Sequence, residues 1–354
     1  MAVGRSTLSA EQLRAFPKVE LHRHLEGTFS LPTLHAMALR NGLPFPEEMD
    51  EFRKLVQFPK DGEPDFLKFL SFFKNDWYSS LDDVAEITAA SVRELARDGI
   101  FYIELRFSPE HFAYHNRFSR EEVTRTVVSA ADAAAAETGI EIRYLITLTR
   151  HKQEEEAMIG LYTLIRDLMI PSIVGIDLAG DETNFPPELF VRLFSTVKSD
   201  GLFGSTIHAG EVSPSRQIWE SIELLGADRI GHGVSAIHDP ELQKLLADRG
   251  ITLEQCITSN YQTGAWADES THPLGRLFRQ GVPVTINSDD PFIQSTDLSE
   301  DYHKAARYFA FDMDDFVKLN LGALEAAFLP GSEREQLKGR YLDAVAAFRQ
   351  EYAL

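Results

Sequence analysis

Cysteine is almost absent from this sequence, since Cys256 is the only one among 354 residues. A single cysteine excludes a disulfide within the chain and any zinc site built from several thiolates. Long apolar runs are also missing, and none approaches the roughly 20 residues of a membrane-spanning helix. The opening residues MAVGRSTLSAEQLRAF contain no apolar core of the length found in signal peptides. We therefore expect a protein of a reducing compartment, the cytoplasm.

Basic residues are scarce beside acidic ones, with 35 Lys and Arg against 55 Asp and Glu, a formal net charge of −20. Such a chain is repelled by the phosphates of nucleic acids and of anionic lipids. The sequence has no basic stripe that offsets this repulsion. We therefore expect neither nucleic acid nor a membrane surface as a partner, and a small molecule is the expected ligand.

The sequence alternates short runs of β-branched and aromatic residues with longer segments of helical periodicity. Most of the runs are almost continuously apolar, which is typical of strands buried on both faces of a parallel sheet. The eight runs are Val19–His24, Ile100–Phe107, Ile140–Thr149, Ile173–Ala179, Phe203–His208, Arg229–Gly233, Ile251–Ser259 and Val282–Ser288. The alternation predicts an α/β fold, one (β/α)8 barrel domain of TIM type over residues 1–354, with a doubly wound open sheet as the alternative.

Two stretches are too long to be simple connections in such a barrel. Residues 28–99, between the first and second runs, are expected to hold extra helices. Residues 298–354 have helical patterning and are expected to pack on the outside of the barrel.

Histidine and aspartate residues stand at the ends of four predicted strands, and in a barrel these ends form the active-site face. His22 and His24 are two residues apart, so they point to the same side of the first strand. His208 ends the fifth run and Asp289 ends the eighth. Three imidazoles and a carboxylate suit zinc and leave a position for water, whereas the alternative is a set of buried structural residues. The fourth strand, Ser172–Gly180, has no lysine to bridge two metals, so one ion is expected.

Further residues at these strand ends have side chains or backbone groups suited to chemistry. Glu211 follows the fifth run, and a carboxyl group buried over the pocket has a raised pKa and can act as a general acid. His232 stands between two glycines and could orient or deprotonate a water. Asp290 points away from Asp289 in extended geometry, and Gly180 offers a backbone N–H without bulk. Taken singly, these residues are also explained as a loop acid, a structural histidine, a helix N-cap and a turn glycine.

Six blocks of the sequence resemble the adenosine/adenine deaminase family of metal-dependent hydrolases. In order, they are VELHRHLEG (19–27), GIDLAGDE (175–182), HAGE (208–211), RIGHG (229–233), TSN (258–260) and NSDDP (287–291). Each block stands at the strand where the family has it. The resemblance implies hydrolytic removal of an amino group from a purine.

By this resemblance, the four strand-end ligands named above hold one zinc ion. His232 and Asp289 then handle the attacking hydroxide, which adds to C6 of the purine. Glu211 protonates N1, and the tetrahedral intermediate loses ammonia to leave a 6-oxopurine. A purine-binding barrel without turnover and a metallohydrolase for amides or phosphoesters are the competing hypotheses. The intact acid and ligand positions count against the first, and the resemblance to purine-binding positions counts against the second.

The same resemblance implies the substrate contacts. Asp290 is expected at N7 and the Gly180 N–H at N3, with His24 and Glu26 also beside the substrate. Adenosine-preferring members usually have aspartate where this chain has Glu26, and adenine-preferring members usually have glutamate.

Two longer segments, Tyr261–Trp266 and Phe66–Leu70, are similar to the adenosine enzymes. We therefore expect adenosine and 2′-deoxyadenosine as substrates. The alternative is adenine or another N9-substituted 6-aminopurine such as aminodeoxyfutalosine.

An aromatic segment after the first strand also belongs to this pattern. Phe66, Phe69, Phe73 and Trp77 recur at helical spacing, which by itself is more typical of packing than of a ligand pocket. The resemblance implies instead that they form a lid helix over the nucleoside.

Overall fold

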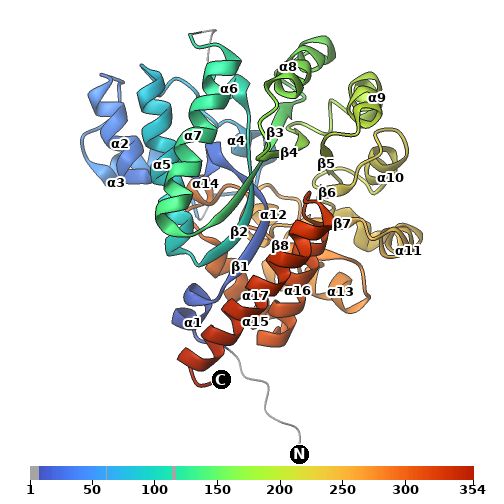
Figure 1. The fold of residues 1–354 in the computed structure, drawn as a ribbon. Helices are drawn as coiled ribbons and strands as arrows, with labels where there is room; N and C mark the ends of the chain where they lie inside the picture. Colours follow the sequence, from blue (N-terminus) through green and yellow to red (C-terminus); the bar gives the residue numbers. More distant parts are fainter. Residues whose placement is uncertain (1–7, 61, 114–116) are drawn as a thin grey trace, which may run out of the picture.

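A computed structural model describes residues 8–60, 62–113 and 117–354, so the first residues of the opening segment examined above lie outside it. Its strands form one eight-stranded sheet in the order β1 to β8, and each strand is parallel to the next (Figure 1). The strands are β1 Lys18–His24, β2 Ile100–Phe107, β3 Glu141–Thr149, β4 Ile173–Ala179, β5 Gly204–Ala209, β6 Arg229–His232, β7 Thr252–Gln255 and β8 Val284–Ile286.

The sheet closes on itself between β1 and the segment that follows β8. The N–H of His24 donates to the carbonyl of Asp289 at 3.0 Å, and the N–H of Asp289 donates to the carbonyl of His22 at 3.1 Å. A parallel bridge between Arg23 and Asp289 marks the same seam. The predicted (β/α)8 barrel is therefore confirmed, and the open-sheet alternative is wrong.

Helices follow the strands and form the outer layer of the barrel (Figure 1). Those between successive strands are α5 Leu81–Arg97, α6 Pro109–Ala113, α7 Arg120–Thr138, α8 Glu155–Leu168, α9 Val191–Asp200, α10 Arg216–Glu223, α11 Pro240–Arg249, α12 Ile257–Gln262 and α13 Leu274–Arg279. Short 3-10 turns are η1 Leu25–Gly27, η2 Pro187–Phe190, η3 Val234–His238 and η4 Glu269–Thr271.

Helix α5 illustrates why these segments are helical. Ser80 and Asp83 form a capping box at its start, which satisfies the free N–H groups of the first turn. The face with Val84, Ile87 and Leu95 is buried against the barrel.

The expected extra helices lie at both predicted places. Between β1 and α5 the chain forms α2 Leu31–Arg40, α3 Met49–Val56 and α4 Phe66–Leu70, and at the C-terminal end it forms α14 Pro291–Gln294, α15 Leu298–Phe309, α16 Met313–Ala326 and α17 Gly331–Glu351. Helix α1, Ala10–Ala15, precedes the barrel. Helices α15, α16 and α17 lie together along one side of the barrel (Figure 1), with α16 against β1 and β8, whereas α14 lies against η1 and α12.

Six of the eight predicted strands agree with the structure to within one residue at each end, but the seventh and eighth are shorter than expected. The prediction that the seventh strand extends to Ser259 is wrong, because Cys256 is the N-cap of helix α12 and the chain is helical from Ile257. Tertiary contacts override the β propensity of this segment. The N–H and hydroxyl of Thr258 both donate to Oδ1 of Asp301, which holds the first turn of the helix.

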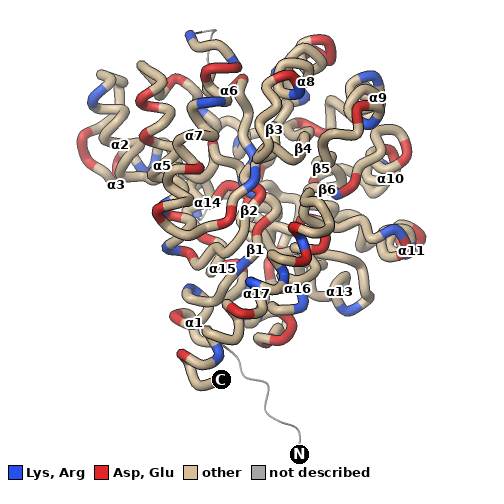
Figure 2. Tube along the Cα trace, viewed as in Figure 1, with Lys and Arg blue, Asp and Glu red and all other residues tan. Residues whose placement is uncertain are grey.

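Figure 2 shows acidic and basic positions interspersed along the outer helices, with charged positions also on the strands. None of the helices in the described ranges has the length and apolarity needed to cross a lipid bilayer.

Candidate active site

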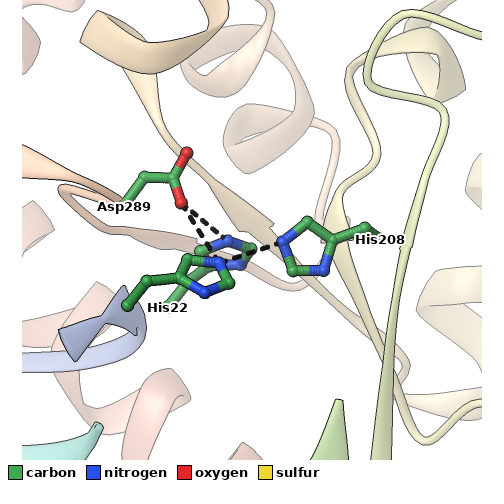
Figure 3. A group of neighbouring side chains, drawn as sticks. His22, His208 and Asp289 are labelled. Carbon is green, nitrogen blue, oxygen red and sulfur yellow. Dashed lines mark hydrogen bonds and ion pairs between the residues drawn. The ribbon is translucent and has the colours of Figure 1, made fainter. Parts of the chain in front are cut away.

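The carboxyl ends of β1, β5 and β8 bring together the four residues predicted as metal ligands. One donor atom from each of His22, His24, His208 and Asp289 lies within 4.8 Å of all the others. Nε2 of His22 and Nε2 of His24 lie 3.2 Å and 3.5 Å from Oδ1 of Asp289. Figure 3 shows that the imidazoles and the carboxylate point toward one centre.

The donor nitrogens of this cluster face one another and Asp289. Nε2 of His22 is buried and forms no hydrogen bond with any described residue. Nε2 of His24 and Nε2 of His208 lie 3.2 Å apart. An unpartnered buried polar atom costs about 1–3 kcal/mol, and a divalent cation can coordinate all of these atoms at once. Since imidazole nitrogens and one carboxylate oxygen are ligands that zinc prefers, the residues present fit this ion.

A second, overlapping group of possible ligands contains Cys256 and His232 together with His22 and Asp289. Burial raises the pKa of the Cys256 thiol well above its usual range. The Cys256 thiol donates to the carbonyl of Glu254 at 3.5 Å and Nδ1 of His232 lies 3.1 Å from Asn260, so these two side chains have partners outside the cluster. The group with His24 and His208 is therefore the better candidate.

Buried carboxylates orient two of the histidines. Nδ1 of His22 lies 2.8 Å from Oε2 of Glu254, and Nδ1 of His208 lies 3.0 Å from Oδ1 of Asp177. Arg106 bridges both acids, with Nη2 2.8 Å from Glu254 and Nη1 3.2 Å from Asp177. Such partners leave Nε2 free for a metal. No role was predicted for these three residues, although charged side chains inside apolar strands are a signal of an interior network.

Burial opposes the ionisation of both acids. The charges of His208 and Arg106 outweigh it at Asp177 and hold the pKa of that carboxyl well below its usual range. The charges of Arg106 and Arg229 do the same for the pKa of Glu254. Both groups are therefore carboxylates that accept from the histidine N–H groups.

Two candidate catalytic residues have strained backbones. His232 has φ +59° and Asp289 has φ +64°, in the left-handed region that residues other than glycine rarely adopt. Such strain is typical of functional sites. The hydroxyl of Ser259 donates to Oδ2 of Asp289 at 2.6 Å, so the helical turn that replaced the predicted strand end holds this carboxylate.

Glu211 turns back over the barrel mouth, as the sequence predicted for a pocket acid. Oε1 of Glu182 accepts from the N–H groups of Val212 and Ser213 at 2.6 and 2.9 Å, which folds the loop inward. Burial, reinforced by the negative charge of Asp289, raises the pKa of Glu211 well above its usual range. Burial therefore favours the protonated form of this acid.

These residues share one cavity of about 260 Å³. All the candidate catalytic and substrate-contact residues line it, namely His24, Glu26, Gly180, Glu211, His232, Asp289 and Asp290. Gly180 has φ +98°. A side chain there would meet Nδ1 of His151 at 2.4 Å, so this position needs glycine.

The aromatic segment covers this cavity only in part. Phe66, Phe69 and Phe73 line it, but α4 ends at Leu70, so Phe73 lies beyond the helix. The prediction for Trp77 is wrong, because it is 2% exposed and its ring stacks on Phe45 at 5.0 Å. Its indole N–H donates to the carbonyl of Lys74 at 2.8 Å, which fixes it in the packed interior.

The end of the cavity beside Glu26 is polar. Oε1 of Glu26 accepts from the N–H of Ser108 at 2.5 Å, while its Oε2 is buried without a partner among the described residues. Burial raises the pKa of Glu26 to about 7. Nε2 of His111 is likewise buried and unpartnered within the described ranges, and Lys152 lines the same end. No signal in the sequence pointed to His111, which lies on helix α6, or to Lys152, which lies in a turn after β3, because both are outside the six blocks.

A (β/α)8 barrel with a histidine and aspartate cluster at the carboxyl ends of its strands defines the class of metal-dependent hydrolases. The family model described as adenosine deaminase matches residues 17–344. An adenosine deaminase of Yersinia pseudotuberculosis is 34% identical over 329 residues, which cover 92% of this chain and 97% of that protein. The chain therefore belongs to the adenosine deaminase family and is an aminohydrolase.

Solved structures confirm the fold. An adenine deaminase from Arthrobacter aurescens is similar with a TM-score of 0.85 and 24% identity, over 94% of this chain and 100% of that one. An amidohydrolase from Burkholderia ambifaria with bound zinc is similar with a TM-score of 0.88 and 23% identity, over 99% of this chain and 97% of that one.

Proposed function

We propose that this protein catalyses the zinc-dependent hydrolytic deamination of adenosine and 2′-deoxyadenosine, giving inosine or deoxyinosine and ammonia. One observation carries this proposal. A single cavity is lined by three of the four metal donors, by the buried acid Glu211 and by the unpartnered polar groups of Glu26 and His111. The adenosine deaminase activity named for the Yersinia relative supports the same substrate.

The metal site proposed here holds one zinc ion per chain, bound by His22, His24, His208 and Asp289. The bound zinc of the Burkholderia amidohydrolase, which has the same fold, agrees with this choice. Zinc supplies a Lewis acid that lowers the pKa of water towards neutrality.

The chain's own residues provide the proton transfers and the orientation. Glu211, protonated because it is buried, donates to N1 of the purine, which makes C6 electrophilic. His232 and Asp289 lie beside the attacking oxygen. The C6–O bond forms as the attacking water loses one proton, and that proton then passes to the amino group. The C6–N bond breaks, ammonia leaves, and the C6 hydroxyl returns its proton to the Glu211 carboxylate, so that a 6-oxopurine remains.

The proposed substrate contacts are those that the family resemblance implies, and the residues concerned all line the cavity. Asp290 meets N7 and the N–H of Gly180 meets N3, while His24 lies against the reacting end of the ring. Glu26 Oε2 then accepts from the 5′ hydroxyl of the sugar, the group that the resemblance associates with this position. Two unpartnered polar atoms at this end, on Glu26 and His111, favour a substrate with a polar group on N9 over bare adenine, because a base alone leaves both unsatisfied.

We further propose that residues 1–354 form one domain, because the C-terminal helix α16 packs against β1 and β8 at the closing seam. The cytoplasmic location stays a prediction from the sequence.

The test is an ammonia-release assay of zinc-loaded protein with adenosine, 2′-deoxyadenosine, adenine and adenosine monophosphate. We expect kcat/KM to be highest for the first two. Faster turnover of adenine than of adenosine contradicts the nucleoside proposal and supports the alternative substrate.

A further inference from the structure

A line of buried hydrogen bonds runs from the backbone of α13 to His232 in the cavity. The N–H of Leu274 donates to Nδ1 of His272 at 3.3 Å. Nε2 of His272 lies 3.0 Å from Oδ1 of Asn260, and Nδ2 of Asn260 lies 3.1 Å from Nδ1 of His232. The three side chains are 0–2% exposed, so these contacts are shielded from solvent.

The direction of each bond in this line follows from its first donor. A backbone N–H can only donate, so Nδ1 of His272 accepts and carries no proton. Burial lowers the pKa of His272 to about 3, and a neutral imidazole has a single N–H, which is then on Nε2. That N–H donates to Oδ1 of Asn260.

The amide of Asn260 can therefore take only one orientation. If it were reversed, His272 would have to accept hydrogen bonds at both ring nitrogens, which a neutral imidazole cannot do. Asn260 thus turns its Nδ2 hydrogens towards His232, and Nδ1 of His232 accepts.

We propose that His272 and Asn260 are positioning residues that fix His232 as the Nε2–H tautomer, which makes His232 a hydrogen-bond donor in the reaction. Nε2 of His232 lies 3.6 Å from Oε2 of Glu211 and 3.9 Å from Oδ2 of Asp289. Its N–H therefore points into the cavity between the two acids.

This inference rests on the proposed deamination and decides between the two roles that the sequence left open for His232. Nδ1 of the neutral ring is occupied by the amide of Asn260, and Nε2 already carries the proton. The ring has no free lone pair with which to deprotonate water. His232 therefore orients the attacking oxygen by donating to it, and the proton from that oxygen passes to the carboxylate of Asp289.

The first test measures the tautomer directly. Protonated and unprotonated imidazole nitrogens have well-separated ¹⁵N chemical shifts, so zinc-loaded protein labelled at histidine reports which nitrogen of His232 carries the proton. We expect a proton on Nε2 and a bare Nδ1 at neutral pH. A protonated Nδ1 on His232 overturns the proposal, whatever the enzyme's activity.

A matched pair of variants then tests the line of bonds itself. In H272Q the amide can still donate to Asn260, whereas in H272L it cannot. We expect H272Q to keep the Nε2–H form of His232, and H272L to lose it with a fall in kcat of about 10²–10⁴-fold and little change in KM. In a serine protease triad, a change that reverses the histidine tautomer without moving it lowers kcat by about 10⁴.

Two further variants separate positioning from general damage. N260L removes the amide that lies between His272 and His232. The double variant N260L/H272L is expected to lower kcat no further than the worse of the two single variants, because each substitution interrupts the same chain of hydrogen bonds. Q262L, on the same helix α12, removes a buried amide whose Nε2 donates to Gln294 instead, and it should leave the His232 tautomer unchanged. Additive losses of kcat in the double variant, or the same His232 tautomer in H272L and H272Q, contradict this relay of hydrogen bonds from His272 through Asn260 to His232.

These outcomes are distinct from a failure of the proposed function. A wild-type protein that shows the expected tautomer but deaminates none of the four purines contradicts the proposed reaction and leaves the relay intact. Active wild-type protein with a protonated Nδ1 on His232 contradicts only the relay.

Discussion

Gly27 packs its α carbon against the carboxylate of Asp290, and a β carbon on Gly27 would lie 1.8 Å from Oδ1 of Asp290. The η1 turn that ends the first block of the sequence therefore sets the position of a residue that follows β8. This contact links two motifs that are more than 260 residues apart.

We expect G27A to displace Asp290 from the substrate and to lower kcat/KM for adenosine by about 10²-fold, the effect typical of a shift of about 1 Å in a positioned group. Crowding should also lower the free energy of unfolding by about 1–3 kcal/mol. Steady-state kinetics and urea unfolding measure the two effects. G160A is the control, because a β carbon there meets nothing within 4 Å. Unchanged activity in G27A contradicts the contact proposed for Asp290.

The metal cluster predicts one tightly held zinc ion per chain. Elemental analysis of zinc-loaded protein should give a stoichiometry near one, and H24A should lose both the metal and activity because it removes one of four donors. H238A is the control, since His238 is an exposed residue whose ring stacks on Trp266. Two tightly held ions, or none after zinc is supplied, contradict the proposed site.

E211Q should abolish turnover without loss of zinc. The amide keeps the shape of the side chain but has no acidic proton for the ring nitrogen, and general acids contribute about 10²–10⁴-fold. Turnover and zinc content are measured on the same preparation. The matched variant E110Q changes a carboxylate that lines the cavity but pairs with Arg120 at 2.7 Å, and it should keep most of the activity. Wild-type turnover in zinc-replete E211Q would exclude Glu211 as the acid.

E26Q tests the sugar contact. Its amide oxygen can still accept from the N–H of Ser108, but the group that replaces Oε2 can no longer accept from a hydroxyl. A lost bond of about 1–3 kcal/mol lowers kcat/KM for adenosine by about 5- to 150-fold. The values for adenine and 5′-deoxyadenosine should stay unchanged, so these two substrates are the internal control. An equal loss for all three substrates places Glu26 elsewhere in the reaction.

Lys18 predicts a dependence of stability on pH that is separate from the active site. Its buried Nζ donates to the carbonyls of Arg14, Phe16 and Asp98 at 3.1, 3.0 and 2.7 Å. Burial lowers the pKa of Lys18 to about 8 from 10.5. Between these two values the unfolded chain binds more protons than the folded one, so the free energy of unfolding contributed by Lys18 rises with pH.

We expect K18M to be less stable than wild type at pH 7 by about 1–3 kcal/mol, because three buried carbonyls lose their donor. The difference between the two proteins should then grow by about 3 kcal/mol between pH 8 and 10.5. Urea unfolding across that range measures it. A difference that is flat or shrinks with rising pH contradicts the lowered pKa.

The sequence by itself determined the barrel and the position of its reactive face. A strand that is buried on both faces has a nearly continuous apolar sequence, whereas a strand with one exposed face alternates apolar and polar residues. Few folds other than this barrel are compatible with eight such runs that alternate with helices. His22 and His24 were predictable as a pair because the two-residue period of a strand is local geometry. For the same reason His208 and Asp289, at other strand ends, were predictable as their neighbours once the barrel was assumed.

Only the tertiary structure decided how these groups are supported and oriented. Arg106 can bridge Asp177 and Glu254 only when the stagger of β2, β4 and β7 brings the three to one level inside the barrel, and no local pattern encodes that stagger. Asn260 lies on helix α12, whose first three residues were predicted as strand, because the contacts of Thr258 with Asp301 outweigh the β propensity of that segment. The tautomer of His232 is set from Leu274, 42 positions along the chain, because hydrogen-bond direction passes between residues only where folding has placed them in contact.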